Sequence, residues 1–234
     1  MPKDVLKYLN NINVDTRFVS LVDNKVYINN LRFSKFSKRK EKVFINRFPD
    51  FNVIRSKIFQ KIYSRASKLL VKNIKPHQTI FILNGNGPLD FALYTVLEPY
   101  QRKYGIKIVK GDSMHEINNF PVDLVAKTLN LDDEVENILN NILNGEKIDL
   151  ISAQECYWED ITNEEGTHKS IRLIYPLLNV PTSWIYSWLN IKSDNDSKDV
   201  LPRSLLNFLE EHVPDVRENI YKSALFVIEN RIEN

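Results

Sequence analysis

Cysteine is almost absent from this chain of 234 residues, which contains only Cys156. One cysteine cannot form an internal disulfide, build a Cys-x-x-Cys metal site, or supply the cysteine pair that some enzymes use to carry sulfur. The histidines are few and scattered without metal-ligand spacing. The sequence therefore excludes an internally disulfide-bonded fold and predicts no metal site.

Long apolar runs are also lacking. No stretch approaches the roughly 20 apolar residues that a membrane-spanning helix requires, and the opening Met1-Pro2-Lys3-Asp4 has neither the apolar core nor the cleavage site of a signal peptide. Hydrophobic residues make up 43% and charged residues 26% of the chain, an ordinary balance for a globular protein with a substantial core. We expect a cytoplasmic protein with no membrane association.

Acidic residues are scarce between Leu31 and Lys75. This segment has fourteen Lys and Arg against two acidic residues, a net charge of +12, whereas the remainder has 18 basic and 28 acidic residues, a net charge of −10. Aromatic residues alternate with basic ones around Phe33 and Phe36, which suits a surface that binds phosphates and bases, although a solvated helix face would also be basic. We expect nucleic-acid binding through Arg32, Lys35, Lys38, Arg39, Lys40, Lys42, Arg47, Arg55, Lys61 and Arg65.

The stretch from Thr79 to Leu97 reads as strand, tight turn and helix. An apolar run ends abruptly at Asn84-Gly85-Asn86-Gly87-Pro88, and an apolar helical pattern follows. In an open α/β sheet such a turn lies at the carboxyl end of a strand, where backbone N–H groups can face a phosphate. A plain turn has the same pattern, so both interpretations stay open.

Other segments before residue 145 have local signals of their own. We expect a hairpin formed by 17–22 and 25–28 around the turn Asp23-Asn24, a helix over 53–71, a strand over 104–109 joined by a crossover, the end of a short helix over 122–126, and a helix over 130–144 with Asn130 as N-cap and Gly145 as its end.

The rest of the chain is expected to contain two short strands, three helices and two polar connections. These are a strand over 147–153, a polar loop over 155–169, a strand over 170–174, a helix over 181–189, a charged linker over 192–199, and two helices within 201–232 that separate near Pro214.

Three of these segments resemble the N-type PP-loop ATP pyrophosphatases that modify tRNA. Asn130-Leu131-Asp132-Asp133-Glu134 and the residues after it are similar to the family's GHNxDDxAxTxLMNxLxG helix, and Ile171 to Val180 are similar to its I-R-P-L-L-x-V strand end. Leu205 to Ile228 resemble the terminal helices of the tRNA-thiolating members. The resemblance places the turn at Asn84 to Asp90 where the family has its SGGxDS phosphate loop.

The turn departs from that loop in ways that weaken phosphate binding. Alignment through Phe91 puts Gly85 to Asp90 on SGGxDS, which keeps one glycine, removes both serine hydroxyls and places a carboxylate beside the pyrophosphate; a register one residue later keeps Gly87 and Asp90 in other roles. The Gly-His that precedes the family's helix is Thr128-Leu129. With Gly87-Pro88 in this place and no cysteine in the N-terminal segment, the chain most resembles the degenerate subunit that accompanies the catalytic one, the cytoplasmic tRNA 2-thiolation protein 2 family.

The resemblance implies an α/β fold with a parallel sheet flanked by helices, of the PP-loop type. Three regions are expected: a basic N-terminal hairpin and helix region over 1–72, a PP-loop-like domain over 73–190, and C-terminal helices over 200–234. The implied function is that of a non-catalytic subunit of a complex that thiolates the wobble uridine of tRNA. An active ATP-dependent tRNA-adenylating enzyme and a stand-alone RNA-binding module are the alternatives.

Site residues follow from the same resemblance. Asn84, Gly85, Asn86, Gly87 and Asp90 form the degenerate nucleotide loop, so no cofactor is expected and ATP binding should be weak or lost. Asn130, Asp132 and Asp133 suit a helix N-terminus on structural grounds alone and equally suit a retained nucleotide site or a partner contact. The expected partners are tRNA and a catalytic PP-loop subunit in a heterodimer, contacted by apolar residues of the C-terminal helices.

Overall fold

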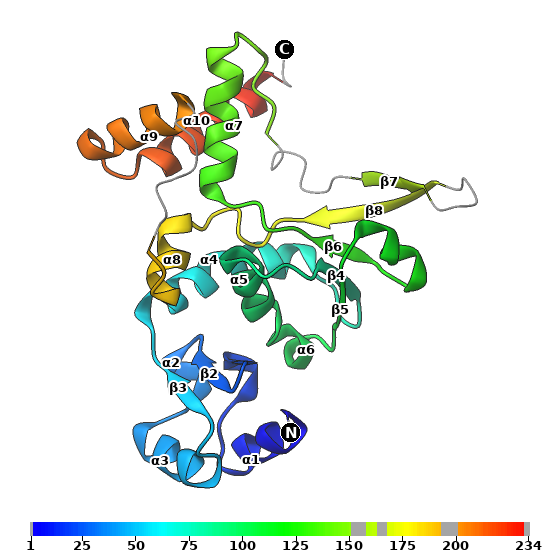
Figure 1. Cartoon of the computed structure of the whole chain (residues 1–234), viewed down its shortest axis with the longest axis vertical. Coiled ribbons are helices and arrows are strands. Elements are labelled where there is room, and N and C mark those ends of the chain that lie inside the picture. Colours follow the sequence, from blue (N-terminus) through cyan, green and yellow to red (C-terminus); the bar gives the residue numbers. More distant parts are fainter. Residues whose placement is uncertain (1, 151–157, 163–167, 193–200, 232–234) are drawn as a thin grey trace.

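The computed structural model describes residues 2–150, 158–162, 168–192 and 201–231. Its larger sheet has the strand order β5-β4-β6-β8-β7 (Figure 1). The strands are β4 (Thr79–Leu83), β5 (Lys107–Gly111), β6 (Leu124–Ala126), β7 (Trp158–Thr162) and β8 (His168–Ile174). Four of them are parallel, and β7 pairs antiparallel with β8 at the edge.

The order of these strands creates a crevice beside β4. The chain passes from β4 to β5 on one side and then crosses to β6 on the other side of β4. In parallel sheets of this kind, ligands bind outside the carboxyl ends of the strands where the strand order reverses. A ligand site is therefore expected at the ends of β4 and β6, at Leu83 and Ala126.

One face of the sheet is covered by helices. Ile80, Ile82, Leu124 and Ile174 pack in one apolar core with helices α4 (Lys57–Asn73), α5 (Pro88–Leu97) and α8 (Thr182–Leu189). Phe81, Val125 and Leu173 point to the other face, where Ile117 of the 3-10 helix η2 (Met114–Asn119) packs against them. The expected α/β class, with a parallel sheet flanked by helices, is confirmed.

A smaller unit precedes this sheet. It consists of α1 (Pro2–Asn11), η1 (Thr16–Phe18), β1 (Val19–Val22), β2 (Lys25–Ile28), α2 (Leu31–Ser34), α3 (Lys38–Arg47) and β3 (Asn52–Ile54). The expected hairpin is present, because β1 and β2 pair antiparallel and the turn residues Asp23 and Asn24 have φ of 48° and 56°. β3 adds a parallel third strand.

Buried charges join the smaller unit to the larger one. Glu98, just after α5, is 5% exposed and accepts hydrogen bonds from the backbone N–H of Leu21 (3.1 Å) and from Arg102 in α6 (Tyr100–Lys103). Arg102 also donates to the carbonyls of Thr16 (2.9 Å) and Val19 (2.8 Å). One ion pair therefore holds the backbone of η1 and β1 against the larger unit.

Three helices form a third layer beyond the carboxyl edge of the sheet (Figure 1). α7 (Leu131–Leu143) leads away from β6 and packs against α9 (Leu201–His212) and α10 (Val216–Arg231). The two expected C-terminal helices are confirmed, including their separation near Pro214, and Gly145 follows α7 with a positive φ of 69°. None of the helices in the described ranges is both long and apolar enough to cross a bilayer.

Several expected elements differ from the structure. Val53 and Ile54 lie in β3, not in the following helix, which begins at Lys57 after the N-cap Ser56. Residues 124–126 form a central strand and not the end of a helix. Residues 147–150 have no regular structure, and β7 and the start of β8 occupy part of the expected loop over 155–169. Cys156, residues 151–153 and nearly all of the expected linker lie outside the described residues.

The division of the chain into three independently folding regions stays a prediction. Helix α4, which belongs to the expected region 1–72, buries Phe59, Ile62, Tyr63 and Leu70 in the core of the larger sheet. The apolar side of α4 therefore packs against residues of the expected region 73–190.

Candidate functional site

The turn after β4 is fixed to the end of the neighbouring strand. The backbone N–H of Asn84 donates to the carbonyl of Gly111 (2.7 Å), and the Asn84 side-chain amide donates to the Asp112 carboxylate (2.9 Å). Helix α5 begins immediately after the turn, with Gly87 as N-cap and Pro88 in its first turn. The turn therefore lies where backbone N–H groups and a helix N-terminus converge at the carboxyl edge of the sheet.

The Asp90 carboxylate occupies the inside of this turn. Its Oδ2 accepts the backbone N–H of Gly87 (3.1 Å), which is the position that a bound anion would take at a helix N-terminus. A Cβ at Gly85 would collide with the same carboxylate, so glycine is required there by close approach. The turn is therefore built around a negative charge that the chain itself supplies.

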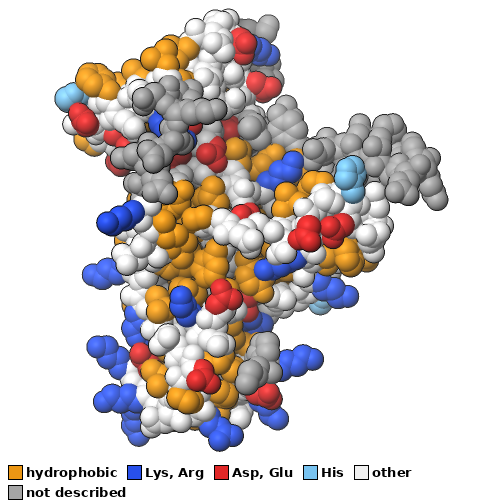
Figure 2. Space-filling model, viewed as in Figure 1, with side chains coloured by type: hydrophobic (Ala, Val, Ile, Leu, Met, Phe, Trp, Pro, Cys, Tyr) orange, Lys and Arg blue, Asp and Glu red, His pale blue; other side chains and the backbone are white. Residues whose placement is uncertain are grey.

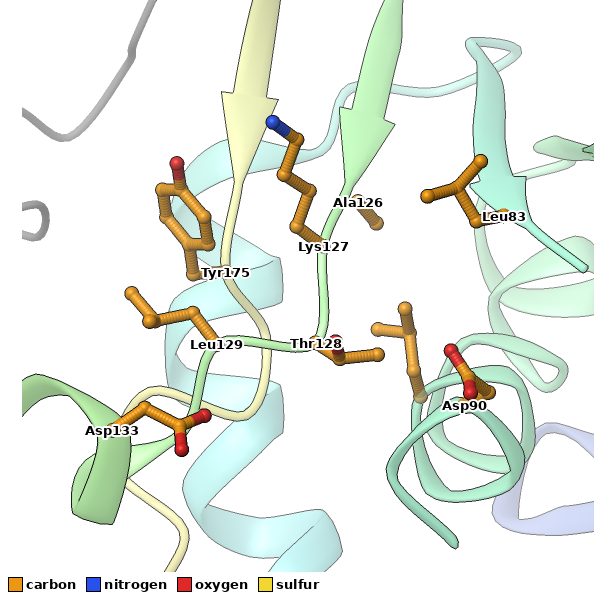
Figure 3. A pocket seen from close by; sticks show the side chains of 9 residues that line it. Leu83, Asp90, Ala126, Lys127, Thr128, Leu129, Asp133 and Tyr175 are labelled. Carbon is orange, nitrogen blue, oxygen red and sulfur yellow. The ribbon is translucent and has the colours of Figure 1, made fainter. Parts of the chain in front are cut away.

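A cavity of about 470 Å³ opens beside Asp90, at the crevice between β4 and β6. Leu83, Leu93, Ala126 and Leu129 form its apolar walls. Figure 3 shows Asp90 and Asp133 on opposite sides, with Thr128 between them. Lys127 and Tyr175 complete the lining. The cavity has the size of a small-molecule site, and its walls suit a flat apolar group.

The N-terminus of α7 forms one side of this cavity. Asn130 is fully buried, and its side-chain oxygen accepts the backbone N–H groups of Asp132 (2.9 Å) and Asp133 (3.3 Å). The Asp133 carboxylate accepts the backbone N–H of Asn130 (3.4 Å), which completes a capping box, and also the Asn130 side-chain amide (2.6 Å). Burial raises the pKa of Asp133, which makes its charged form less favourable inside the cavity wall.

Asp132 has a structural environment of its own. Its carboxylate accepts the backbone N–H of Thr182 at the start of α8 and pairs with Arg217 of α10. It is 9% exposed and does not line the cavity. The structure therefore brings Asp90, Asn130 and Asp133 to one region, and it places Asp132 at the junction of α7, α8 and α10.

The charges around the cavity oppose a polyphosphate. Asp90 and Asp133 are carboxylates, and Lys127 is the one basic residue among the lining residues described. At an effective dielectric constant of about 20, a like charge at 4 Å costs about 4 kcal/mol. No three His, Cys, Asp or Glu side chains converge as metal ligands within the described ranges.

The basic residues expected to bind nucleic acid fall into two groups. Three are engaged within the protein: Lys40 donates to the carbonyls of Asn13 (2.6 Å) and Lys35 (2.9 Å), Arg55 pairs with Glu41 (2.6 Å), and Arg65 pairs with Glu218 (2.9 Å). The others are exposed and form no ion pair within the described part of the chain: Arg32, Lys35, Lys38, Arg39, Lys42, Arg47 and Lys61. Figure 2 shows Lys and Arg side chains along the lower margins of the molecule.

Most of the cavity walls were not predicted from the sequence, because 122–126 were expected to be the end of a short helix. Once residues 124–126 are read as a strand, Lys127, Thr128 and Leu129 follow its carboxyl end and must face the crevice. The available signal was the short apolar run Val122-Asp123-Leu124-Val125-Ala126 just before the N-cap Asn130.

No family model matches the chain. A comparison with curated proteins finds similarity to a "Probable sulfurtransferase" of Methanocaldococcus jannaschii, with 28% identity over 94 residues. The match covers 39% of this chain and 28% of that protein, so the aligned segment spans less than a third of the relative. This similarity is consistent with a sulfur-transfer family.

Proposed function

We propose that this chain is a non-catalytic subunit of a system that transfers sulfur to tRNA, in which it binds the tRNA while another subunit activates the wobble uridine. The observation that carries the proposal is the Asp90 carboxylate inside the turn after β4. Because the turn already holds an anion, the pyrophosphate of ATP has no favourable position there. The similarity to a probable sulfurtransferase supports the choice of reaction class.

The test is the production of AMP and pyrophosphate from ATP by the purified chain, with and without tRNA. We expect no release above the background, because the turn lacks hydroxyl groups and contains its own carboxylate. Release that is abolished by Gly87→Arg, a substitution at the α5 N-cap, would contradict the proposal and favour an active enzyme.

An active ATP-dependent tRNA-adenylating enzyme is the second candidate. It is favoured by the cavity of about 470 Å³ at the crevice, whose apolar walls suit an adenine ring. Equilibrium dialysis with adenosine and with ATP separates the candidates. Adenosine binding without ATP binding fits the non-catalytic subunit, whereas tighter binding of ATP fits the enzyme.

The tRNA contact is assigned to the exposed basic residues of the smaller unit. Lys38, Arg39 and Lys42 lie on α3, which contains one acidic residue, Glu41, already paired with Arg55. Charge reversal at Lys38, Arg39 and Lys42 should weaken tRNA binding and flatten its salt dependence, since each lost phosphate contact lowers the slope by about 1. An unchanged slope would count against this segment.

A catalytic partner subunit is the last part of the proposal. Leu206, Val216 and Ala224 are buried against α7, but Phe208 (58% exposed) and Phe226 (67% exposed) remain uncovered. These rings offer an apolar surface on which a second subunit can pack. Size-exclusion chromatography with light scattering, with and without a candidate catalytic PP-loop protein, tests this: failure to form a joint complex would remove the partner from the proposal.

A further inference from the structure

Helix α4 has a row of lysines on its outer side that the expected set of RNA-binding residues leaves out, except for Lys61. Lys57, Lys61, Lys68 and Lys72 are all exposed, and their spacing of four, seven and four residues keeps them on one side of the helix. At a rise of 1.5 Å per residue the row is about 22 Å long. It contains no acidic residue, since α4 has none.

The row is unneutralised and rigidly held. Within the described ranges none of these four lysines forms an ion pair. The opposite side of α4 buries Phe59, Ile62, Ala66 and other apolar residues in the core of the larger sheet. The lysines therefore stand on a helix whose orientation is fixed by packing, which lowers the entropic cost of binding a rigid ligand.

Arg55 fixes α3 to the beginning of α4. It precedes the N-cap Ser56, its guanidinium pairs with Glu41 of α3 (2.6 Å), and it donates to the carbonyl of Phe36 (3.0 Å). Arg55 therefore holds α3, with its exposed basic residues, in a fixed position relative to the lysines of α4. Figure 2 shows Lys and Arg side chains along the margin of the molecule at the level of these elements.

Beyond the α4 row, Trp184 of α8 is already in contact with cations. The Arg65 guanidinium carbon lies 4.2 Å from the ring centroid and the Lys61 ammonium 5.5 Å from it. Val71 is the one exposed apolar side chain of α4. This side of α4 therefore offers positive charge but few flat faces on which unpaired bases could stack.

We propose that the α4 lysine row, Lys57, Lys61, Lys68 and Lys72, binds the phosphate backbone of a double-helical RNA stem and extends the α3 surface along that stem. The proposal rests on the proposed function for its choice of RNA. Charge without exposed aromatic faces matches recognition of a duplex by its backbone, whereas single strands are bound through stacking. An unpaired row of lysines on a fixed helix supplies that charge.

The test compares two triple variants of the full chain that lose the same charge. The first is Lys57→Gln, Lys68→Gln and Lys72→Gln, which removes three lysines of the row. The control is Lys107→Gln, Lys147→Gln and Lys222→Gln, which removes exposed lysines of β5, the segment after α7, and α10. Fluorescence anisotropy with an RNA hairpin stem, a single strand of equal length and anionic lipid vesicles is measured over a range of salt concentrations.

The first variant should bind the stem on the order of tenfold more weakly near 0.1 M salt, with a log–log salt slope shallower by about 3, while the control keeps nearly the wild-type slope. Circular dichroism and thermal melting check that both variants fold. An unchanged slope in the first variant, or equal losses in both, would overturn the inference while leaving tRNA binding through α3 intact. Wild-type protein that binds vesicles but no RNA would overturn the proposed function as well.

Discussion

Asp90 decides the character of the turn after β4 because of where its carboxylate lies. An aspartate near the start of a helix is usually a capping residue, and Asp90 does cap the Gly87 N–H. The same carboxylate lies against Gly85, where it places a negative charge beside the cavity of about 320 Å³ at this turn. One carboxylate thus caps the helix and also makes the turn negatively charged.

Asp90→Ser should open this site. The substitution removes the negative charge, restores a hydroxyl at the position where the family has one in the first register, and should raise the affinity for pyrophosphate by about tenfold or more. Isothermal titration calorimetry with pyrophosphate measures the change. Asp112→Ser, which removes an exposed carboxylate near the same turn, is the control; equal effects of the two substitutions would show that only the general field matters.

Lys103 is a second residue whose surroundings alter its chemistry. Its ammonium donates to the Tyr63 hydroxyl (2.7 Å) and lies 4.9, 4.9 and 5.0 Å from the ring centroids of Phe18, Tyr63 and Tyr100. Burial, reinforced by the nearby charge of Arg17, lowers the pKa of Lys103 to about 8. Loss of hydration therefore outweighs the attraction of the rings.

This lowered pKa predicts a rise of stability with pH. Between pH 8 and about 10.5 the unfolded chain binds more protons at Lys103 than the folded chain, so the free energy of unfolding increases across that range. Lys103→Met should remove this increase, and the exposed Lys107→Met should keep it. Urea unfolding from pH 7.5 to 9.5 measures it, and a wild-type to Lys103→Met difference that stays constant over this range would contradict the assignment.

At the scale of elements, the N-terminus of α7 combines two tasks. Asn130 caps the helix and also accepts a hydrogen bond from the Thr182 hydroxyl (3.1 Å), which ties α7 to α8. Its neighbour Asp133 faces the cavity, whereas Asp132 holds α10 through Arg217. The N-terminus of α7 therefore forms a wall of the cavity and also connects α7 to α8 and α10.

Asn130→Ala should be more destabilising than removal of an ordinary cap. It deletes the cap and removes the side-chain amide that donates to the half-buried Asp133 carboxylate, so we expect a loss of about 2 to 3 kcal/mol. Ser37→Ala at the exposed start of α3 removes a comparable cap and should cost only about 0.5 to 1 kcal/mol. Chemical unfolding of both variants measures the difference, and equal costs would show that the burial of Asn130 adds nothing.

The elements that were predictable have strong local signals. The hairpin has a two-residue turn between β-rich runs, and α7 has an N-cap, acidic residues in its first turn and a final glycine. β6 has only three residues and is buried throughout, so it lacks the alternation that identifies a half-buried strand. Its neighbours β4 and β8 in the sheet, far away in sequence, decide its conformation.

The candidate site was predictable in position but not in content. The resemblance located the turn at Asn84 to Asp90 and the start of α7, and the structure places Asp90 and Asp133 at one cavity. The rotamer that brings the Asp90 carboxylate against Gly85, and the walls supplied by β6, depend on tertiary packing. The engagement of Arg55 and Arg65 in ion pairs could not be read from charge counts either.

At the scale of the whole molecule, the buried pair of Glu98 and Arg102 connects the smaller unit to the larger one. Three backbone groups of η1 and β1, at Thr16, Val19 and Leu21, bond to these two side chains. Charged residues are rarely buried unless they are paired and fully hydrogen-bonded, as these are. The relative position of the two units therefore depends on a few polar contacts as well as on apolar packing.

Arg102→Met should loosen that connection. Leaving Glu98 buried without its partner should cost about 3 to 5 kcal/mol, and hydrogen exchange at the backbone of β1 should accelerate. Arg17→Met, which breaks the exposed pair of Arg17 and Asp15, should cost less than about 1 kcal/mol. Exchange mass spectrometry combined with chemical unfolding tests both expectations, and equal protection of β1 in the two variants would refute the connecting role.

The contact between Leu21 and Glu98 also orders events during synthesis on the ribosome. The two residues are separated by 77 positions, which takes a ribosome about 4 to 15 s to translate. Until then the hairpin of the nascent chain can form its own turn, but the backbone N–H of Leu21 has no carboxylate to bind. Until Glu98 has been synthesised, the backbone of β1 therefore lacks the contact that holds it against the larger unit.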